Sequence, residues 1–277
     1  LQFAELIMDS SNKLRDEDCS IEADSTPELL LSISRNKEGG RCSVGPICGL
    51  DVWTAYELSW LDMQGLPQVA IGEFSVPCES NNIIESKSLK IYLNDFNQRR
   101  IPSWTHVSKM LYTDMSQIVG IPIGVQLFTL DNYYRHRPIS ELQGGCIDRT
   151  TFLKSSVDVD ADFLTINHAK EVKETLYTHL LRTNCPVTNQ PDWASLLVTY
   201  EGCKIQEAGL LAYIISYRLH QDFHERCVEK IFYDLMEQCK PKALTVCARY
   251  LRRGGIDINP IRSTHDDYSF DIRLVRQ

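Results

Sequence analysis

The feature that most constrains this chain is a succession of predicted elements that occurs twice. In the first half, residues 52–63 and 67–77 are predicted as two strands around the turn QGLP. Apolar residues at helical spacing then predict helices over 83–96 and 103–118, and a strand is predicted over 124–130. This half is therefore expected to fold as a module of the order ββααβ.

The second half repeats this order. Its predicted elements are strands over 173–183 and 193–202, helices over 205–219 and 225–239, and strands over 243–250 and 269–275. Superposing GLPQVAIGEF on NQPDWASLLV aligns Pro67 with Pro191 and then places Glu85 opposite Gly209. The matching order predicts a duplicated module, and the predicted fold class is α+β with antiparallel sheets.

Length and composition set the expected domains. A chain of 277 residues forms one large domain or two of ordinary size. We predict a first module over 46–145 and a second module over 146–277. Residues 1–45 are polar and acidic with weak periodicity, so they are predicted to form an N-terminal arm.

Charge and cysteine content narrow the class of function. The formal net charge of -8 argues against a nucleic acid as the direct partner, because a phosphate backbone requires a basic surface. No apolar run approaches the roughly 20 residues that span a bilayer, and the first residues do not resemble a secretory signal. The ten cysteines form no C-x-x-C pair, which predicts reduced thiols and a cytoplasmic location.

The stretch NCPVTNQPDWAS carries the strongest chemical signal. Cys185 is followed by Pro186 and Asp192 follows Pro191, so proline restricts the loop that carries both side chains. A thiolate is a nucleophile, and an acid within loop reach could exchange a proton with the atom under attack. A turn in which Asp192 satisfies backbone amides and Cys185 only packs would explain the same residues.

Two further motifs also allow two interpretations each. His224 and Glu225 precede an amphipathic helix, where they could donate a proton and bind a heterocycle. Alternatively, Asp222 could cap that helix with Glu225 as its capping-box partner. Glu85, in ESKSLK, could bind a ligand or complement the dipole of its helix.

The segment RRGGIDINPIRS could bind an anion. It combines Arg252, Arg253 and Arg262 with Gly254 and Gly255, and paired glycines allow a phosphate to approach the backbone closely. A tight turn explains the glycines equally well. No G-x-G-x-x-G follows a predicted strand, so a Rossmann-type nicotinamide site is not indicated.

Together these stretches resemble the two-module form of the nitrile reductase family, which makes 7-aminomethyl-7-deazaguanine from 7-cyano-7-deazaguanine on the queuosine pathway. The resemblance covers residues 51–277 and is carried, in order, by AYELSWLDMQGLPQVAIGEF, IESKSLKIYL, TNCPVTNQPDWAS, FHERCVEKI and RRGGIDINPIRS. It implies tandem tunnelling-fold (T-fold) modules with helices on one face of each sheet and active sites between modules. The implied substrate is a small molecule. Because each module carries only part of a site, the sequence predicts at least a dimer, taken here as a homodimer.

The resemblance further implies residue roles. Cys185 would add to the nitrile carbon as a covalent thioimide, Asp192 would protonate the nitrogen, and His224 would assist proton transfer. Two molecules of NADPH would supply hydride, and no metal would be required. The implied substrate-binding residues are Ile84, Glu85, Ser86, His224 and Glu225, and the implied NADPH-binding residues are Ser86, Lys87, Arg253 and Gly254.

Two other functions fit the same residues. A zinc-dependent pterin cyclohydrolase of the same fold superfamily would use Cys185 and His224 as metal ligands. A non-enzymatic purine- or pterin-binding protein would need the binding residues alone. The sequence also leaves open whether Glu85 serves the Cys185 site of its own chain or of a partner.

Overall fold

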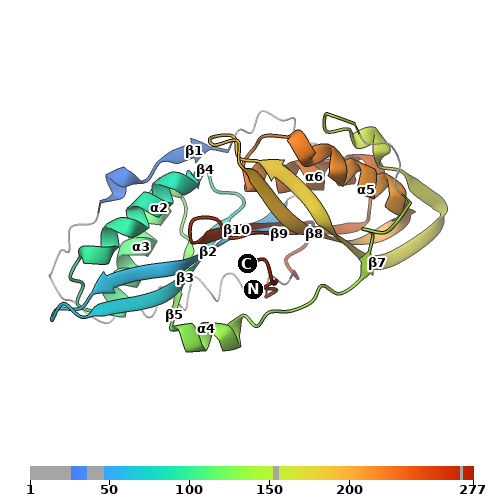
Figure 1. The fold of residues 1–277 in the computed structure, drawn as a ribbon. Coiled ribbons are helices and arrows are strands. Elements are labelled where there is room, and N and C mark those ends of the chain that lie inside the picture. The colour runs from blue at the N-terminus through green and yellow to red at the C-terminus, as the bar shows by residue number, and fades with distance from the viewer. Residues whose placement is uncertain (1–25, 36–46, 152–155, 269–270) are drawn as a thin grey trace. The chain divides into compact units, whose positions relative to one another are not determined.

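The computed structural model describes residues 26–35, 47–151, 156–268 and 271–277 (Figure 1). They belong to two compact units, each described here by itself. Unit 1 comprises the described residues within 1–37, 51–138 and 252–257, and unit 2 comprises those within 38–50, 139–251 and 258–277. Short segments from each half of the chain thus belong to the unit of the other half. Most of the predicted N-terminal arm lies outside the described residues.

Unit 1 contains three neighbouring strands of a sheet, in the order β5-β3-β2. Strand β3 (Pro67–Pro77) pairs antiparallel with β5 (Gly124–Phe128), and β2 is Cys48–Leu61, of which the first three residues belong to unit 2. Helices α2 (Ser86–Asp95) and α3 (Trp104–Val119) lie side by side on one face of this sheet (Figure 1). The predicted hairpin and both predicted helices of the first half are therefore present.

Caps fix both ends of α3. The Ser103 hydroxyl accepts a hydrogen bond from the His106 amide at 3.3 Å, as an N-cap serine should. Gly120 ends the helix in the left-handed conformation, with φ of 79°, which glycine adopts without steric cost.

The start of α2 differs from the prediction by three residues. Asn82–Ile84 form a short strand, β4, that pairs antiparallel with β1 (Ser32–Ser34), so the helix predicted from residue 83 begins at Ser86. Ile83 and Ile84 are buried as strand residues. Their helical spacing relative to Leu89 was coincidental, because a short strand offers too few residues to show its own period.

Unit 1 also contains elements that the sequence did not predict. The expected strand over 124–130 ends at Phe128, because Thr129 caps a short helix, α4 (Leu130–His136), by accepting a hydrogen bond from the Asn132 amide. The 3-10 helices of this unit are η1 (Pro27–Leu29) and η2 (Phe96–Gln98).

Unit 2 contains strands in the order β10-β9-β8-β7-β6. Neighbours pair antiparallel except β6 and β7, which are parallel. The elements are β6 (Gly145–Cys146), η3 (Ala161–Phe163), β7 (Ile166–Asn184), β8 (Pro191–Ile205), α5 (Glu207–Ser216), η4 (Tyr217–Leu219), α6 (His224–Cys239), β9 (Ala243–Tyr250) and β10 (Ile256–Ser263).

The strand predicted over 269–275 is wrong. Among the described residues, the last strand is β10, which pairs antiparallel with β9. Residues 269–270 lie outside the described residues. Within 271–275, Arg273 makes only an isolated bridge. Strand β10 was not predicted because Pro260 lies inside it and a proline argues against a strand. All eight residues of β10 are buried, so its sequence also lacks alternation.

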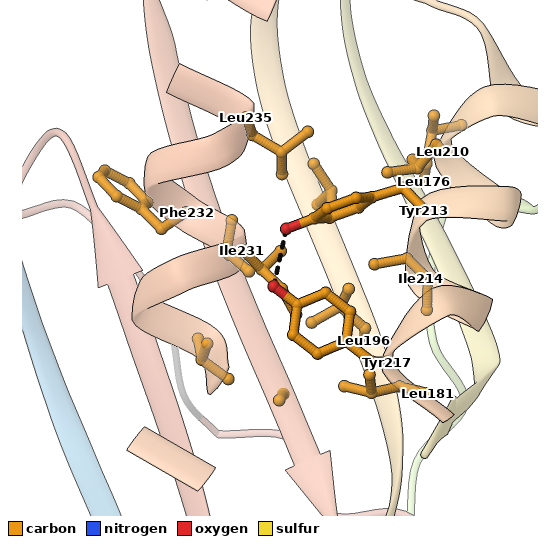
Figure 2. Packing of buried hydrophobic residues seen from close by; sticks show 14 of the residues in the cluster. Leu176, Leu181, Leu196, Leu210, Tyr213, Ile214, Tyr217, Ile231, Phe232 and Leu235 are labelled. Atoms are coloured by element: carbon orange, nitrogen blue, oxygen red, sulfur yellow. Dashed lines mark hydrogen bonds between the residues drawn. The ribbon is translucent and has the colours of Figure 1, made fainter. Parts of the chain in front are cut away.

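The core of unit 2 lies between helices α5 and α6 and strands β7 to β9 (Figure 2). Leu181 and Leu196 contribute from the strands, and Ile214 and Ile231 from the two helices. Two buried tyrosines of this core satisfy each other's polar ends, because the hydroxyls of Tyr213 and Tyr217 lie 2.8 Å apart.

The helices of the two units match in order and length. Helices α2 and α5 have 10 residues each, α3 and α6 have 16 each, and each shorter helix continues into a 3-10 turn. The ungapped superposition is wrong in one detail. Glu85 precedes α2 as its N-cap and Gln206 precedes α5, so Gln206 rather than Gly209 corresponds to Glu85. The inserted strand β4 accounts for the three-residue offset.

The described residues are mixed α/β with mainly antiparallel strands. Among them, no helix combines the length and apolar character needed to cross a bilayer.

Candidate active site

The β7–β8 hairpin of unit 2 fixes the backbone of Cys185. The amide of Cys185 donates to the carbonyl of Gln190, and its carbonyl accepts from the amide of Asn189, both at 2.9 Å. Asn189 adopts a left-handed conformation with φ of 54°, which asparagine tolerates better than most residues. The hairpin end is tied further by the Asn184 amide, which donates to the carbonyl of His220 at 2.8 Å. Cys185 is 9% exposed, so its thiol sits at the edge of the interior.

Asp192 lies just after this turn. It is the second residue of β8, pairs with Thr183 and is 2% exposed. Its Oδ2 lies 3.3 Å from Nε2 of His224, the first residue of α6. Asp192 therefore does more than satisfy turn amides, because its carboxylate faces a titratable ring across the start of a helix.

The surroundings of His224 assign one of its ring hydrogens. Nδ1 lies 3.4 Å from the carbonyl oxygen of Ile258. A carbonyl can only accept, so Nδ1 carries a hydrogen. Nε2 then faces Oδ2 of Asp192. A proton can pass between these two groups at the hairpin end that carries Cys185.

The capping-box interpretation of Glu225 is wrong. Helix α6 begins after Phe223, and this N-cap makes no side-chain capping bond. Asp222 instead accepts from the Phe223 amide at 2.8 Å and faces Arg226 at 3.6 Å. Glu225 is 2% exposed, and a carboxylate is buried to this extent only where it has polar partners.

The ESKSLK motif lies in unit 1, at the start of α2. Glu85 is the N-cap, and its two carboxylate oxygens accept from the amides of Lys87 and Ser88 at 2.9 and 2.7 Å. Ile84 is a buried residue of β4, Ser86 begins the helix, and Lys87 is exposed. The helix-terminus interpretation of Glu85 is therefore correct for this structure, and its carboxylate remains half-buried.

A segment of the predicted arm positions this motif. The Glu85 amide donates to the carbonyl of Leu31 at 2.8 Å, and the Leu31 amide donates to the Ser88 hydroxyl at 3.0 Å. Strand β1 then continues the contact along β4. The sequence missed this role because a three-residue strand leaves no periodic pattern.

Arg253 and Gly254 also belong to unit 1. Gly254 and Gly255 adopt φ of 64° and 79°, and the Arg253 amide donates to the carbonyl of Ile256, so the segment does make a tight turn. The side chain of Lys90, from α2, lies 3.1 to 3.3 Å from the point that a Cβ on Gly254 would occupy. The glycine turn and a cation of the ESKSLK motif are therefore neighbours.

Arg262 is not part of an anion site. It is fully buried in β10, donates to the backbone carbonyl of Ile261 at 2.9 Å and faces Glu229 at 3.5 Å. Only the first part of the RRGGIDINPIRS segment therefore presents cations around the glycines.

The structure thus gathers the predicted site residues into two groups. The group in unit 2 is Cys185, Asp192, His224 and Glu225, and the group in unit 1 is Ile84, Glu85, Ser86, Lys87, Arg253 and Gly254. Two residues of unit 2 that the sequence did not single out join the first group, namely Tyr250, whose ring stacks on His224, and Ile258. Tyr250 is the last residue of strand β9, and no motif in the sequence distinguishes it from a tyrosine of the core.

Other cysteines in the described residues differ from Cys185 in their surroundings. Burial raises the pKa of the Cys227 thiol well above its ordinary value and that of Cys239 to about 12. Both therefore remain protonated, unreactive thiols at neutral pH. Within the described part of the chain, no cluster of three or more histidine, cysteine or acidic side chains has the arrangement of a metal site.

Comparison with known proteins gives the class. Residues 22–127 match the family described as "Nitrile reductase, 7-cyano-7-deazaguanine-reductase N-term", and residues 191–269 match the family described as "QueF-like protein". These two segments include every predicted site residue except Cys185, which lies between them. The class is that of the nitrile reductases, which are oxidoreductases.

Two curated relatives are named NADPH-dependent 7-cyano-7-deazaguanine reductase. The protein from Desulfotalea psychrophila is 46% identical over 260 residues, covering 91% of this chain and 92% of that protein. The protein from Saccharophagus degradans is 48% identical over 249 residues, covering 90% and 91%. The chain belongs to the NADPH-dependent 7-cyano-7-deazaguanine reductase family.

One solved structure, a crystal structure of an archaeosine synthase QueF-Like in the apo form, also matches. It is 16% identical to this chain, with a TM-score of 0.30, and the match covers 34% of this chain and 94% of that one.

Proposed function

We propose that this chain reduces the nitrile of 7-cyano-7-deazaguanine to the amine of 7-aminomethyl-7-deazaguanine with NADPH, in queuosine biosynthesis. Membership of the reductase family supports the activity. The observation that supports the mechanism is the contact between the Asp192 carboxyl and the His224 ring at the end of the hairpin that bears Cys185.

Cys185 and its acid divide a difficult reaction into easier steps. The thiolate of Cys185 adds to the nitrile carbon, and the nitrile nitrogen takes a proton from the pair of Asp192 and His224, which gives a thioimide. This adduct accepts hydride more readily than the nitrile. Its carbon–sulfur bond breaks when the carbon is reduced to an imine, which releases the thiolate, and a second reduction gives the amine. NADPH, when bound, supplies the two hydrides that this four-electron reduction requires.

The substrate is held, in this proposal, by carboxylates. Glu85 and Glu225, with the backbone near Ile84 and Ser86, accept hydrogen bonds from the donor-rich edge of the deazaguanine. Glu85 already accepts two backbone amides, and each carboxylate oxygen retains a further acceptor position. His224 borders the same substrate. A free base carries no phosphate, which agrees with an acidic chain and with no direct nucleic-acid partner.

The first unit provides residues that fit NADPH. Positive φ at Gly254 and Gly255 leaves room for a phosphate close to the backbone. The side chain of Lys90 beside Gly254 places positive charge there. Lys87 lies in the first turn of α2, and the start of a helix favours an anion. We propose that Ser86, Lys87, Arg253 and Gly254 hold the cofactor.

We further propose that the two units are tunnelling-fold modules of a cytoplasmic homodimer. The repeated order of elements and the mainly antiparallel pairing support the fold. Light scattering on the purified chain should give twice the mass of one chain, and a monomer that is fully active would contradict the dimer.

Turnover tests the activity. With 7-cyano-7-deazaguanine, the wild-type protein should oxidise two NADPH for each amine formed, and Cys185→Ala should oxidise none. Asp192→Asn should lower kcat by about 10²–10⁴-fold, the usual contribution of a positioned acid. Cys146→Ala is the matched control, because Cys146 is an exposed thiol of the same unit. A wild-type protein that oxidises no NADPH in the presence of the nitrile would contradict the proposal.

A further inference from the structure

We propose that Tyr250 is a positioning residue for this reaction, whose ring holds the imidazole of His224 in place and favours its doubly protonated form. The inference rests on the proposed function. The two rings lie face to face, with centroids 3.7 Å apart and planes 5° apart. Tyr250 is fully buried, so its ring forms a fixed surface for the less buried histidine.

The register of unit 2 explains why Tyr250 reaches His224. Tyr250, the last residue of β9, pairs with Ala194 in β8. Asp192 lies two residues before Ala194, and side chains two apart on a strand share a face. Asp192 and Tyr250 therefore project from the same face, toward the start of α6. One contacts the edge of the imidazole and the other its flat side.

The backbone beneath the ring is also fixed. The Tyr250 amide donates to Oδ1 of Asn259 at 3.0 Å, and the same oxygen accepts from Nε2 of Gln277 at 2.7 Å. A side-chain amide thus replaces a ladder hydrogen bond at the end of β9. This leaves the tyrosine ring little freedom to follow a moving imidazole.

The stacking geometry distinguishes the protonation states of His224. Two neutral aromatic rings prefer edge or offset contacts, and a parallel face-to-face pair is disfavoured. The other tyrosine contacts of this core follow that rule, since Tyr213 and Tyr217 meet at 84° and Tyr217 and His220 at 78°. A cation over the face of a ring is attracted instead. The parallel stack therefore favours an imidazolium.

The edge contacts of the same ring agree with an imidazolium. Nδ1 faces the carbonyl of Ile258 and Nε2 faces Asp192, and only a ring with two N–H groups donates to both. Burial raises the pKa of Tyr250 itself, so its phenol stays neutral. The groups that act on His224 are therefore Asp192 from β8, Tyr250 from β9, the Ile258 carbonyl from β10 and neighbouring Glu225 in α6.

Two substitutions separate the ring from its hydroxyl. Tyr250→Phe keeps the aromatic face and removes only the hydroxyl. Tyr250→Leu removes the face. Tyr200→Leu is the control for loss of a buried tyrosine of unit 2, because Tyr200 is equally buried and its hydroxyl bonds Glu174 instead.

Kinetics should separate these variants. Tyr250→Leu should lower kcat about tenfold or more, because proton transfer from a positioned group contributes about 10²–10⁴-fold. The KM for the nitrile should change little. The pH–rate profile should move to lower pH, because the imidazolium loses the aromatic face that favours it. Tyr250→Phe should keep kcat within about twofold, since its ring provides the same π face. The proposal is overturned if Tyr250→Leu loses no more kcat than Tyr200→Leu, or if Tyr250→Phe loses as much as Tyr250→Leu.

A spectroscopic readout does not depend on activity. In ¹⁵N NMR of histidine-labelled protein at neutral pH, His224→Gln identifies the His224 signal among the seven histidines. The wild type should show hydrogens on both ring nitrogens, and Tyr250→Leu should lose one of them. Identical spectra in the two proteins overturn the positioning role. Absence of nitrile-dependent NADPH oxidation in the wild type, with the spectra differing as expected, would overturn the proposed function alone.

Discussion

A backbone carbonyl orients the imidazole of His224. The oxygen of Ile258 accepts from a hydrogen on Nδ1, and this orientation turns Nε2 toward Asp192. The residue types at Cys185, Asp192 and His224 could be predicted from the sequence, because thiols, acids and imidazoles carry recognisable chemistry. The partners at Ile258 and Tyr250 could not, because a carbonyl has no sequence signature and a buried tyrosine resembles any core residue.

A second histidine of the same region provides a pH-dependent test. Burial lowers the pKa of His220, and nearby Asp222 offsets this in part. The pKa of His220 in the folded protein thus lies below its value of about 6.5 in the unfolded chain. Between these two pKa values the unfolded chain binds the proton more readily than the folded protein. The contribution of His220 to stability is therefore present above about pH 6.5 and is lost as the pH falls through the folded-state pKa.

The substitution His220→Gln should isolate this contribution. The free energy of unfolding of the wild type, minus that of the variant, should decrease as the pH is lowered from about 8 to about 5. Denaturant unfolding at several pH values measures the difference. A difference that grows toward acid pH would contradict the direction of the shift.

At the scale of elements, long periodic segments were predicted well and short ones were not. Helix α3 was predicted over 103–118, within one residue of its observed ends, because its apolar residues recur at helical spacing and Gly120 follows it. Strands β1 and β4 were missed, since three residues cannot display a period of two over several repeats. Their pairing nevertheless positions Glu85. The sequence-only account of that site was therefore incomplete.

The duplication supplies a controlled comparison of helix ends. Helix α3 ends at Gly120 with φ of 79°, whereas its counterpart α6 ends at Lys240, which is also left-handed with φ of 47°. A residue with a Cβ is strained in this conformation by about 1–2 kcal/mol. Gly120→Ala should therefore destabilise the protein by about 1 kcal/mol, and Lys240→Gly should stabilise it by about 0.5–1 kcal/mol after the entropy cost of glycine.

Thermal unfolding measures both changes. Lys240→Ala is the control, because it removes the lysine side chain and keeps the strained backbone, and it should leave Tm near the wild-type value. A gain in Tm from Lys240→Ala equal to that from Lys240→Gly would assign the effect to the side chain.

At the scale of the whole molecule, the duplicated units carry different residues on the same order of elements. Unit 2 carries Cys185, Asp192 and His224, and unit 1 carries the ESKSLK motif and the glycine turn beside Lys90. Counterparts at equivalent positions have no such chemistry, since the N-cap of α5 is Gln206 where α2 has Glu85. We therefore expect that substitutions in unit 2 can abolish the covalent bond between Cys185 and the nitrile, and that substitutions in unit 1 can impair the use of NADPH while that bond still forms.

Intact-mass spectrometry after mixing the protein with 7-cyano-7-deazaguanine, without NADPH, tests this most directly. The wild type and Cys146→Ala should each gain the mass of one substrate molecule, and Cys185→Ala should gain none. Lys87→Ala should still form the adduct while its turnover with NADPH falls. An unmodified wild-type protein, or an adduct that persists in Cys185→Ala, would contradict covalent catalysis by Cys185.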